Sequence, residues 1–213
     1  MAAGIKKIKA GVVRFIAVTL LTGVLIAGIG ILTASAAKPV EITYGYHPYW
    51  TGGWTGVVIK QRELWKKYLP KGSTVNFEAH LTGPPMVNAL LADKMQIGTM
   101  GDMPSYVATT KKKQGDIRLV SANMISAGQN CNLLLVKKDA PDFASPNEAL
   151  MWLNDKKVSV HRGTCANRYL ASILDSNAVK PKKLQYMTIE VIASSFEAGK
   201  LDAAAMWEPH ARK

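Results

Sequence analysis

Apolar residues follow two different periods along the chain from about residue 40 onward. Short runs with alternating apolar positions predict β-strands, and stretches with an apolar residue every three or four positions predict α-helices. The expected strands are at 40–46, 75–79, 95–100, 117–124, 131–136, 157–161, 184–188 and 201–206. The expected helices are at 57–68, 86–91, 148–153, 164–174 and 191–199. This alternation predicts an α/β fold in which crossover helices join parallel strands.

The alternation breaks once, because no helix is expected between the strands at 117–124 and 131–136. We interpret this break as the place where the chain crosses from one lobe to another. A first α/β lobe is therefore expected over 37–125 and a second over 126–213. A helix end, turn, strand and acidic residue recur at 92–102 and 198–208, which favours two related lobes.

The first 36 residues have the pattern of a secretory signal peptide. Three lysines and Arg14 precede a run without charge from Phe15 to Leu32, and Ala34-Ser35-Ala36 suits signal cleavage. We expect cleavage after Ala36 and a mature protein in the periplasm. The alternative is an uncleaved membrane anchor, since the apolar run approaches the about 20 residues that span a bilayer.

Composition and charge narrow the classes of function. Of 213 residues, 48% are hydrophobic and 20% charged, which is ordinary for a globular protein. The net charge of +12 would suit nucleic acid, but the export signal argues against that partner. The short basic runs at 111–113 and 180–183 are interpreted as solvated faces, which could also attract an anionic solute or an acidic partner surface.

Glycine-bearing loops precede the expected helices at the carboxyl ends of strands, where ligands of open α/β sheets bind. They are Gly52-Gly53, Thr82-Gly83 and Arg162-Gly163-Thr164. Glycine lets the backbone approach a ligand closely, and a helix N-terminus offers free N–H groups and partial positive charge. The loops thus predict a site for an anionic group, unless each glycine serves only a tight turn. Aromatic side chains surround the first loop and could form its apolar walls, namely Tyr46, His47, Trp50 and Trp54.

Four segments carry a family resemblance across the whole expected mature chain. They are the aromatic, glycine-rich stretch after the first strand, 83–92, 97–104 and 201–209. Together they resemble the type 2 periplasmic binding proteins of ABC importers that serve as nitrate, sulfonate, taurine and thiamine-precursor receptors. The resemblance implies a two-lobed α/β clamshell that closes on a small solute and delivers it to an inner-membrane permease. We further expect a monomer without a cofactor, and no binding of nucleic acid.

The resemblance also implies which residues face the ligand. The matching positions are Gly53, Trp54, Thr82, Gly83, Gly101, Asp102, His161, Arg162, Gly163, Thr164, Trp207 and Glu208. Arg162 could clamp a sulfonate or carboxylate with two hydrogen bonds. Asp102 and Glu208 could hold an amine or cap a helix. The expected solute is therefore a small organic anion or a zwitterion.

Other readings of the sequence stay open. Cys131 and Cys165 could form a disulfide in an oxidising compartment. Cys165 is also the best catalytic candidate, because a helix N-terminus can activate a thiol, but no orienting acid is evident and we expect no enzyme. A receptor that reports to a sensor protein is another alternative. The four histidines lack metal-ligand spacing, so no metal site is expected.

The end of the sequence departs from the clamshell pattern. The chain stops soon after its last expected strand, whereas a clamshell receptor returns to its first lobe and adds further helices. A C-terminally truncated clamshell is therefore the expected architecture.

Overall fold

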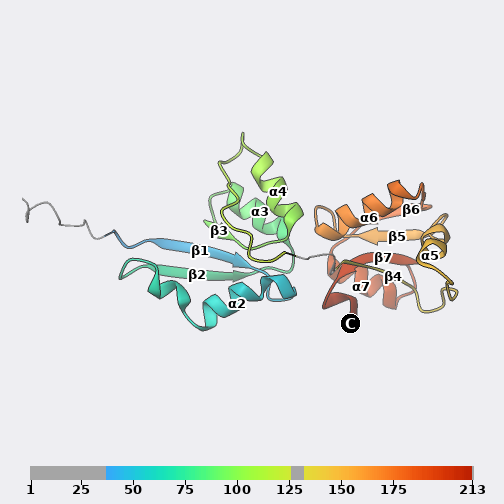
Figure 1. Ribbon diagram of the computed structural model, residues 1–213, viewed down its shortest axis with the longest axis horizontal. Coiled ribbons are helices and arrows are strands. Elements are labelled where there is room, and N and C mark those ends of the chain that lie inside the picture. The colour runs from blue at the N-terminus through green and yellow to red at the C-terminus, as the bar shows by residue number, and fades with distance from the viewer. Residues whose placement is uncertain (1–36, 126–131, 213) are drawn as a thin grey trace, which may run out of the picture. The chain divides into compact units, whose positions relative to one another are not determined.

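The computed structural model describes residues 37–125 and 132–212 (Figure 1). Within it, residues 39–213 form a single compact unit whose strands make two separate sheets. The predicted signal peptide over 1–36 and the predicted disulfide partner Cys131 lie outside the described residues. Across the described ranges, no helix is both long enough and apolar enough to cross a membrane.

The first sheet has the strand order β2-β1-β3. Its strands are β1 (Glu41–Tyr46), β2 (Thr74–Ala79) and β3 (Ile97–Gly98), and both pairings are parallel. Parallel strands need crossover connections, which helices supply here. As a result, the carboxyl ends of all three strands lie at one end of the sheet.

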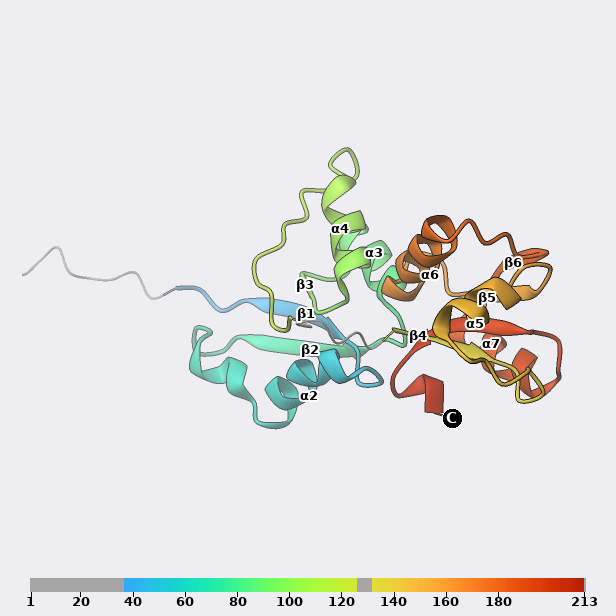
Figure 2. The same ribbon diagram turned by 45° about the vertical axis from the view of Figure 1, so that its right-hand side comes forward.

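Helices cover both faces of the first sheet. Figures 1 and 2 show α3 (Gly83–Leu91) and α4 (Asp102–Thr110) on one face and α2 (Trp54–Gln61) on the other. α2 is preceded by a short 3-10 helix, η1 (Thr51–Gly53), and followed by another, η2 (Leu64–Lys67). The single helix expected over 57–68 is therefore two, since Glu63 between them adopts a left-handed conformation with φ 49°.

The second sheet has the strand order β4-β7-β5-β6. Its strands are β4 (Asn132–Val136), β5 (Lys157–Val160), β6 (Lys183–Tyr186) and β7 (Ala203–Trp207). β7 is central and every one of its residues is buried, which explains its unbroken apolar sequence. β5 pairs in parallel with β6 and β7, as the alternation of strands and helices predicted, whereas β4, the strand at the break in that alternation, runs antiparallel to β7.

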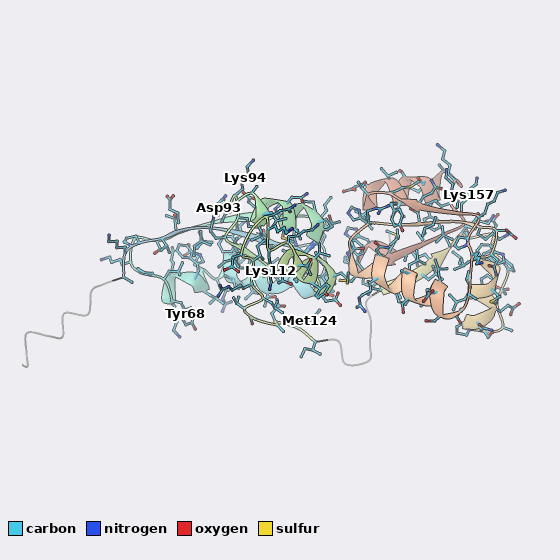
Figure 3. The ribbon with its side chains drawn as sticks, turned by 90° about the horizontal axis from the view of Figure 1, so that it is seen from above. Tyr68, Asp93, Lys94, Lys112, Met124 and Lys157 are labelled. Carbon is cyan, nitrogen blue, oxygen red and sulfur yellow. The ribbon has the colours of Figure 1, made fainter. Side chains whose placement is uncertain are left out.

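The main core lies around the second sheet. α6 (Cys165–Ser176) and α7 (Ile189–Glu197) lie on opposite faces of this sheet (Figure 2), while α5 (Pro146–Trp152) and the 3-10 helix η3 (His210–Arg212) complete the second half. Fully buried apolar side chains from these helices and strands meet in one cluster, among them Val158, Leu170, Ile192 and Leu201. The surface carries the lysines: Lys94, Lys112 and Lys157 are exposed, and the side chains of Lys94 and Lys157 extend away from the ribbon (Figure 3).

The strand expected over 117–124 was wrong, because residues 111–125 contain no strand. Leu119 and Val120 are 69% and 88% exposed there, which shows that these residues with high strand propensity do not pack against a sheet. α4 was not among the expected helices, because it buries only Pro104 and Ala108 among nine residues and lacks a clear apolar stripe. This helix contributes directly to the pocket described below.

A test of α2 packing follows from Gly56, on which an added Cβ would come 2.5 Å from Tyr46 Cβ. We expect Gly56→Ala to lower the free energy of unfolding by about 1–3 kcal/mol, because overpacking against a backbone-fixed atom outweighs a gain in helix propensity of about 1 kcal/mol. Urea unfolding measures this change. Gly115→Ala is the control, since its nearest neighbour would lie at 3.6 Å and stability should hardly change. Equal stability of the two variants would contradict the prediction.

Candidate functional site

A small pocket open to solvent lies at the N-terminal ends of α3, α4 and α6. Its volume of about 40 Å³ holds a few water molecules, at about 10–15 Å³ each. The lining residues are His47, Trp50, Thr82, Gly83, Gly101, Pro104, Asn132, Thr164, Cys165 and Trp207. No lysine, arginine or carboxylate is among these residues, so the pocket is built from aromatic rings, small residues and neutral polar groups.

Two glycines allow the helix ends to meet closely. A Cβ on Gly83 would come 2.4 Å from Pro104 Cγ, and a Cβ on Gly101 would come 2.4 Å from Cys165 Sγ. Gly83 is the first residue of α3 and Gly101 is the N-cap of α4. The close packing of α3 on α4, and of α4 on α6, therefore requires residues without side chains at these positions.

Side-chain hydrogen bonds fix the turn that leads from β5 into α6. Thr164 Oγ1 donates to the carbonyl oxygen of His161 at 2.7 Å and accepts from Asn167 N–H at 3.2 Å. Gly163 has a φ of +74°, and its N–H donates to Asn167 Oδ1 at 3.1 Å. With the turn fixed, the first N–H groups of α6 have no acceptor within the helix, and they create partial positive charge beside the pocket.

An ion pair joins α4 and α6 beside the pocket. Arg168 Nη2 lies 2.7 Å from Asp102 Oδ2, and Asp102 Oδ1 accepts from Met103 N–H at 2.8 Å. Burial acts to raise the pKa of the Asp102 carboxyl, but hydrogen bonds from Cys165 and Met103, together with the Arg168 charge, hold that pKa below its ordinary value. Asp102 thus stays ionised, with its charge matched by Arg168.

Cys165 is the first residue of α6, and it forms no disulfide with any residue in 37–125 or 132–212. Burial, and then the hydrogen bond to Asp102, raise the pKa of this thiol to about 11. Both effects outweigh the helix N-terminus, which alone would favour the thiolate. Its pairing with Cys131 stays a prediction, because Cys131 lies outside the described residues.

Sequence comparison finds two curated relatives, and no family model matches the chain. The chain is 25% identical over 180 residues to the "Putative aliphatic sulfonates-binding protein" of Escherichia coli K12, covering 83% of this chain and 52% of that protein. It is 23% identical over 178 residues to the taurine-binding periplasmic protein of the same organism, covering 83% of this chain and 51% of that protein. The chain thus spans about half the length of the curated relatives it matches.

Structure comparison gives the same group of proteins. The alkanesulfonate-binding protein of Xanthomonas axonopodis pv. citri bound to MOPS superposes with a TM-score of 0.61 at 20% identity, covering 82% of this chain and 56% of that one. The periplasmic aliphatic sulphonate binding protein of E. coli superposes with a TM-score of 0.55 at 23% identity, covering 81% and 56%. The fold is that of the type 2 periplasmic binding proteins. The fold class and the resemblance expected from the sequence are therefore confirmed.

This fold brings some of the expected site residues together and leaves others apart. Thr82, Gly83, Gly101, Thr164 and Trp207 all line the pocket. The remaining expected residues are not among the lining residues: Gly53, Trp54, Asp102, His161, Arg162, Gly163 and Glu208. Asp102 and Gly163 lie next to lining residues and hold the α4–α6 contact and the α6 turn.

The other expected residues have different surroundings. Trp54 is 56% exposed, and its Nε1 donates to the carbonyl oxygen of Pro48 at 3.2 Å. The guanidinium of Arg162 stacks 3.8 Å from the ring centre of Tyr186. His161 is half-buried, and burial lowers its pKa against the opposing charge of Glu190. Glu208 follows β7 directly and is half-buried.

His47 and Trp50 were expected as aromatic walls around the first glycine-rich loop, and both line the pocket. Pro104 and Asn132 gave no signal in the sequence, because their positions depend on packing between distant segments. Among the described residues there is no group of three or more histidine, cysteine, aspartate or glutamate side chains that could hold a metal ion.

The raised pKa of Cys165 predicts slow alkylation. In a Cys131→Ser variant at pH 8, about one thiol in a thousand would be ionised, so iodoacetamide should react about tenfold or more slowly than with an ordinary thiol. Asp102→Asn should lower the pKa of Cys165, because it removes the carboxylate beside the thiol. Mass spectrometry across pH 7–11 measures both rates. A rate profile with its midpoint near that of a free thiol would contradict the burial of Cys165.

Proposed function

We propose that the protein is the solute-binding component of an ABC importer, which captures a small organic anion or zwitterion in the periplasm and delivers it to a membrane permease. The observation that carries this proposal is the pocket at which the N-termini of α3, α4 and α6 converge. The names of the curated relatives, which bind sulfonates and taurine, support the same class of solute.

The electrostatics of the pocket support an anionic head group. α6 and α4 begin beside it, and each N-terminus carries about half a positive charge with N–H groups that point outward. α3 offers fewer donors, because Pro84 and Pro85 follow Gly83 and lack N–H groups. We therefore place the anionic oxygens nearer α6 and α4, with Thr82 and Thr164 as neighbouring hydroxyl groups.

The aromatic walls support an organic solute. Trp50, Trp207 and His47 line the pocket, and aromatic residues suit a short carbon chain better than a bare inorganic ion. Because the pocket is small, a solute of a few carbon atoms would need the lining to open before it enters. A pocket that closes around its solute is the behaviour expected of a clamshell receptor.

Closure joins the two proposed lobes, 37–125 and 126–213. The Asp102–Arg168 ion pair and the Gly101–Cys165 contact both link α4 to α6 across this division. Solute held by both helix ends would add to these contacts and favour the closed arrangement. The monomeric state and the permease partner are part of the same proposal.

We propose binding without catalysis. The relatives are named as binding proteins, and Cys165, the alternative nucleophile, has a thiol pKa of about 11. A nucleophilic cysteine needs a thiolate near neutral pH. The Asp102 carboxylate beside Cys165 disfavours that thiolate instead of creating it.

A thermal-shift screen tests the function. The full-length protein is heated with taurine, alkanesulfonates, nitrate, bicarbonate or a thiamine-precursor pyrimidine. A short sulfonate or aminosulfonate should raise the melting temperature, and the rise should grow with concentration as mass action requires. Succinate at equal ionic strength is the control for unspecific anion effects. A folded protein with no response to the whole panel would refute the proposed solute class.

Substitutions separate the pocket from its surroundings. Arg162→Ala should change the Kd of the bound sulfonate by less than about twofold, because Arg162 stacks on Tyr186 and does not line the pocket. Gly101→Ala should weaken binding by at least about tenfold, because its Cβ would displace the Cys165 side chain at the pocket. Isothermal titration calorimetry measures both. A large loss with Arg162→Ala, about 1.5–3 kcal/mol, would place a charged hydrogen bond from Arg162 in the site.

A further inference from the structure

We propose that a surface at one end of the first sheet binds the anionic head groups of a membrane. This surface consists of the 3-10 helix η2 and the turn that follows it. We call it the η2 surface, and its members are Leu64, Trp65, Lys66, Lys67, Tyr68 and Lys71. None of these residues lines the pocket, so the inference stands separately from the proposed function.

The η2 surface exposes aromatic and aliphatic side chains. η2 has no buried residue, and the chain turns away from α2 at Glu63, whose φ is 49°. Leu64 is 44% exposed, Trp65 is half-buried, and Tyr68 is 75% exposed on the outside of the ribbon (Figure 3). Single exposed apolar residues are common, but a group of them within five consecutive residues indicates a contact site.

Basic side chains surround these apolar groups. Residues 60–71 contain five basic residues and one acidic residue. Lys66 Nζ lies 5.6 Å from the ring centre of Trp65, and Lys67 Nζ lies 5.4 Å from the ring centre of Tyr68. Positive charge and aromatic rings are therefore presented together on the same short turn.

The one acidic residue leaves most of this charge unpaired. Glu63 Oε1 lies 2.7 Å from Lys66 Nζ, but both side chains are more than half exposed, and water weakens such an ion pair. Among the described residues, neither Lys67 nor Lys71 forms an ion pair. The η2 surface thus keeps an excess of positive charge for an external partner.

A bilayer that contains anionic lipids matches both properties of the η2 surface. Tryptophan and tyrosine favour the head-group region, where a ring meets apolar chains and its polar edge meets water. Lysine stems extend along apolar surface while the ammonium groups reach the phosphates. Each lysine close to an anionic membrane adds to the attraction. An acidic protein surface would satisfy the lysines alone and leave Leu64 and Tyr68 in water.

The chain itself brings the η2 surface to a membrane. A Cβ on Gly72 would come 3.3 Å from Pro39 Cγ, and Val40 N–H donates to Ser73 Oγ at 3.1 Å, so the turn after η2 packs on the residues that lead into β1. The apolar run of the expected export signal ends at Leu32, seven residues before Pro39. Seven residues span at most about 25 Å. During export this end of the first sheet is therefore held close to the head groups.

Membrane contact at the η2 surface leaves the pocket accessible. The turn after η2 enters β2 at its amino end, whereas His47 and Thr82, which line the pocket, follow the carboxyl ends of β1 and β2. Each of these strands has six residues, which corresponds to about 20 Å. Solute binding and membrane binding are therefore compatible in one molecule.

Lysine acetylation in vesicles tests the inference. The full-length protein is incorporated into vesicles of phosphatidylcholine, either alone or with about one-third phosphatidylglycerol. After brief treatment with an amine-acetylating reagent, mass spectrometry gives the rate at each lysine. The reference is the exposed run 111–113, which follows α4 on the other face of the first sheet. Dividing by this reference corrects for protein enclosed inside vesicles.

The relative acetylation rate of Lys66, Lys67 and Lys71 should be at least about threefold lower with phosphatidylglycerol than without it, because head groups cover the ammonium groups. Sodium chloride at about 0.5 M should restore the rate, since salt screens this attraction. Equal relative rates in both kinds of vesicle would overturn the inference and would leave an acidic protein surface as the partner.

Tryptophan quenching supplies a second readout. Brominated phospholipids in the anionic vesicles should quench part of the fluorescence, and Trp65→Phe should remove at least about half of that quenching. Trp54→Phe is the matched control, because Trp54 is also exposed but begins α2, outside the η2 surface. Quenching that is unchanged in the Trp65→Phe variant would contradict the inference.

Charge variants separate the η2 surface from overall charge. Lys66→Glu combined with Lys67→Glu should reduce the quenching at least about threefold, since repulsion replaces attraction. Lys111→Glu combined with Lys112→Glu makes the same change in net charge and should leave the quenching intact. An equal reduction in both double variants would assign the binding to overall charge and reject the η2 surface.

The outcomes are independent of the proposed function. The double variant at Lys66 and Lys67 should keep the thermal response to solute of the unaltered protein, which also shows that the variant is folded. A protein whose η2 surface is protected but which responds to no solute would reject the proposed solute class and retain this inference.

Discussion

The pocket depends on the close approach of helix ends, which the glycines at 83 and 101 make possible. An α-helix delivers its partial charge only within its first turn, so helices must meet almost end to end before their fields add at one point. Any side chain at these two glycines would push the helices apart, because Pro104 and Cys165 occupy the space. The small volume of the pocket and the Asp102–Arg168 ion pair both follow from this packing.

Neutral polar groups line the pocket, and the charged side chains nearest to it lie at its border. Inside the pocket, helix dipoles and neutral polar groups are the available source of favourable electrostatic interactions with an anion. Because these groups carry no net charge, they need no counterion in the absence of a solute. At the border, Asp102 and Arg168 neutralise each other. The net positive charge of the chain is instead carried by exposed lysines such as Lys94, Lys112 and Lys157. The proposed recognition of an anionic solute therefore rests on short-range geometry more than on overall charge.

Much of the fold could be predicted because strand and helix periods are strong where burial is complete. β5, α6 and β7 lie within a few residues of their expected positions, since their apolar residues enter one core. Prediction failed where the secondary structure preferred by the local sequence differs from the one that packing in the folded chain allows. The apolar run around Val120 has strand-forming residues but no sheet to join, and α4 is helical with hardly any apolar stripe.

The site could be predicted where glycine and threonine in the sequence mark a turn from a strand into a helix. Thr82-Gly83 and Gly163-Thr164 mark strand-to-helix turns, and they indicated correctly where helices begin. Asn132 enters the pocket only because β4 lies beside β7, and no local pattern shows such a pairing. Arg162 has the chemistry of an anion clamp, but Tyr186 offers a stacking surface that sequence spacing does not show.

In an oxidising compartment, the raised pKa of Cys165 affects when its thiol can react during folding. Thiol oxidation and disulfide exchange proceed through the thiolate, which the finished pocket suppresses. A bond between Cys165 and Cys131 would therefore form faster in the unfolded chain, where the pKa of Cys165 is not raised by burial. Once α4 has packed on α6, burial and the Asp102 carboxylate keep the sulfur protonated, which slows its reaction with oxidants.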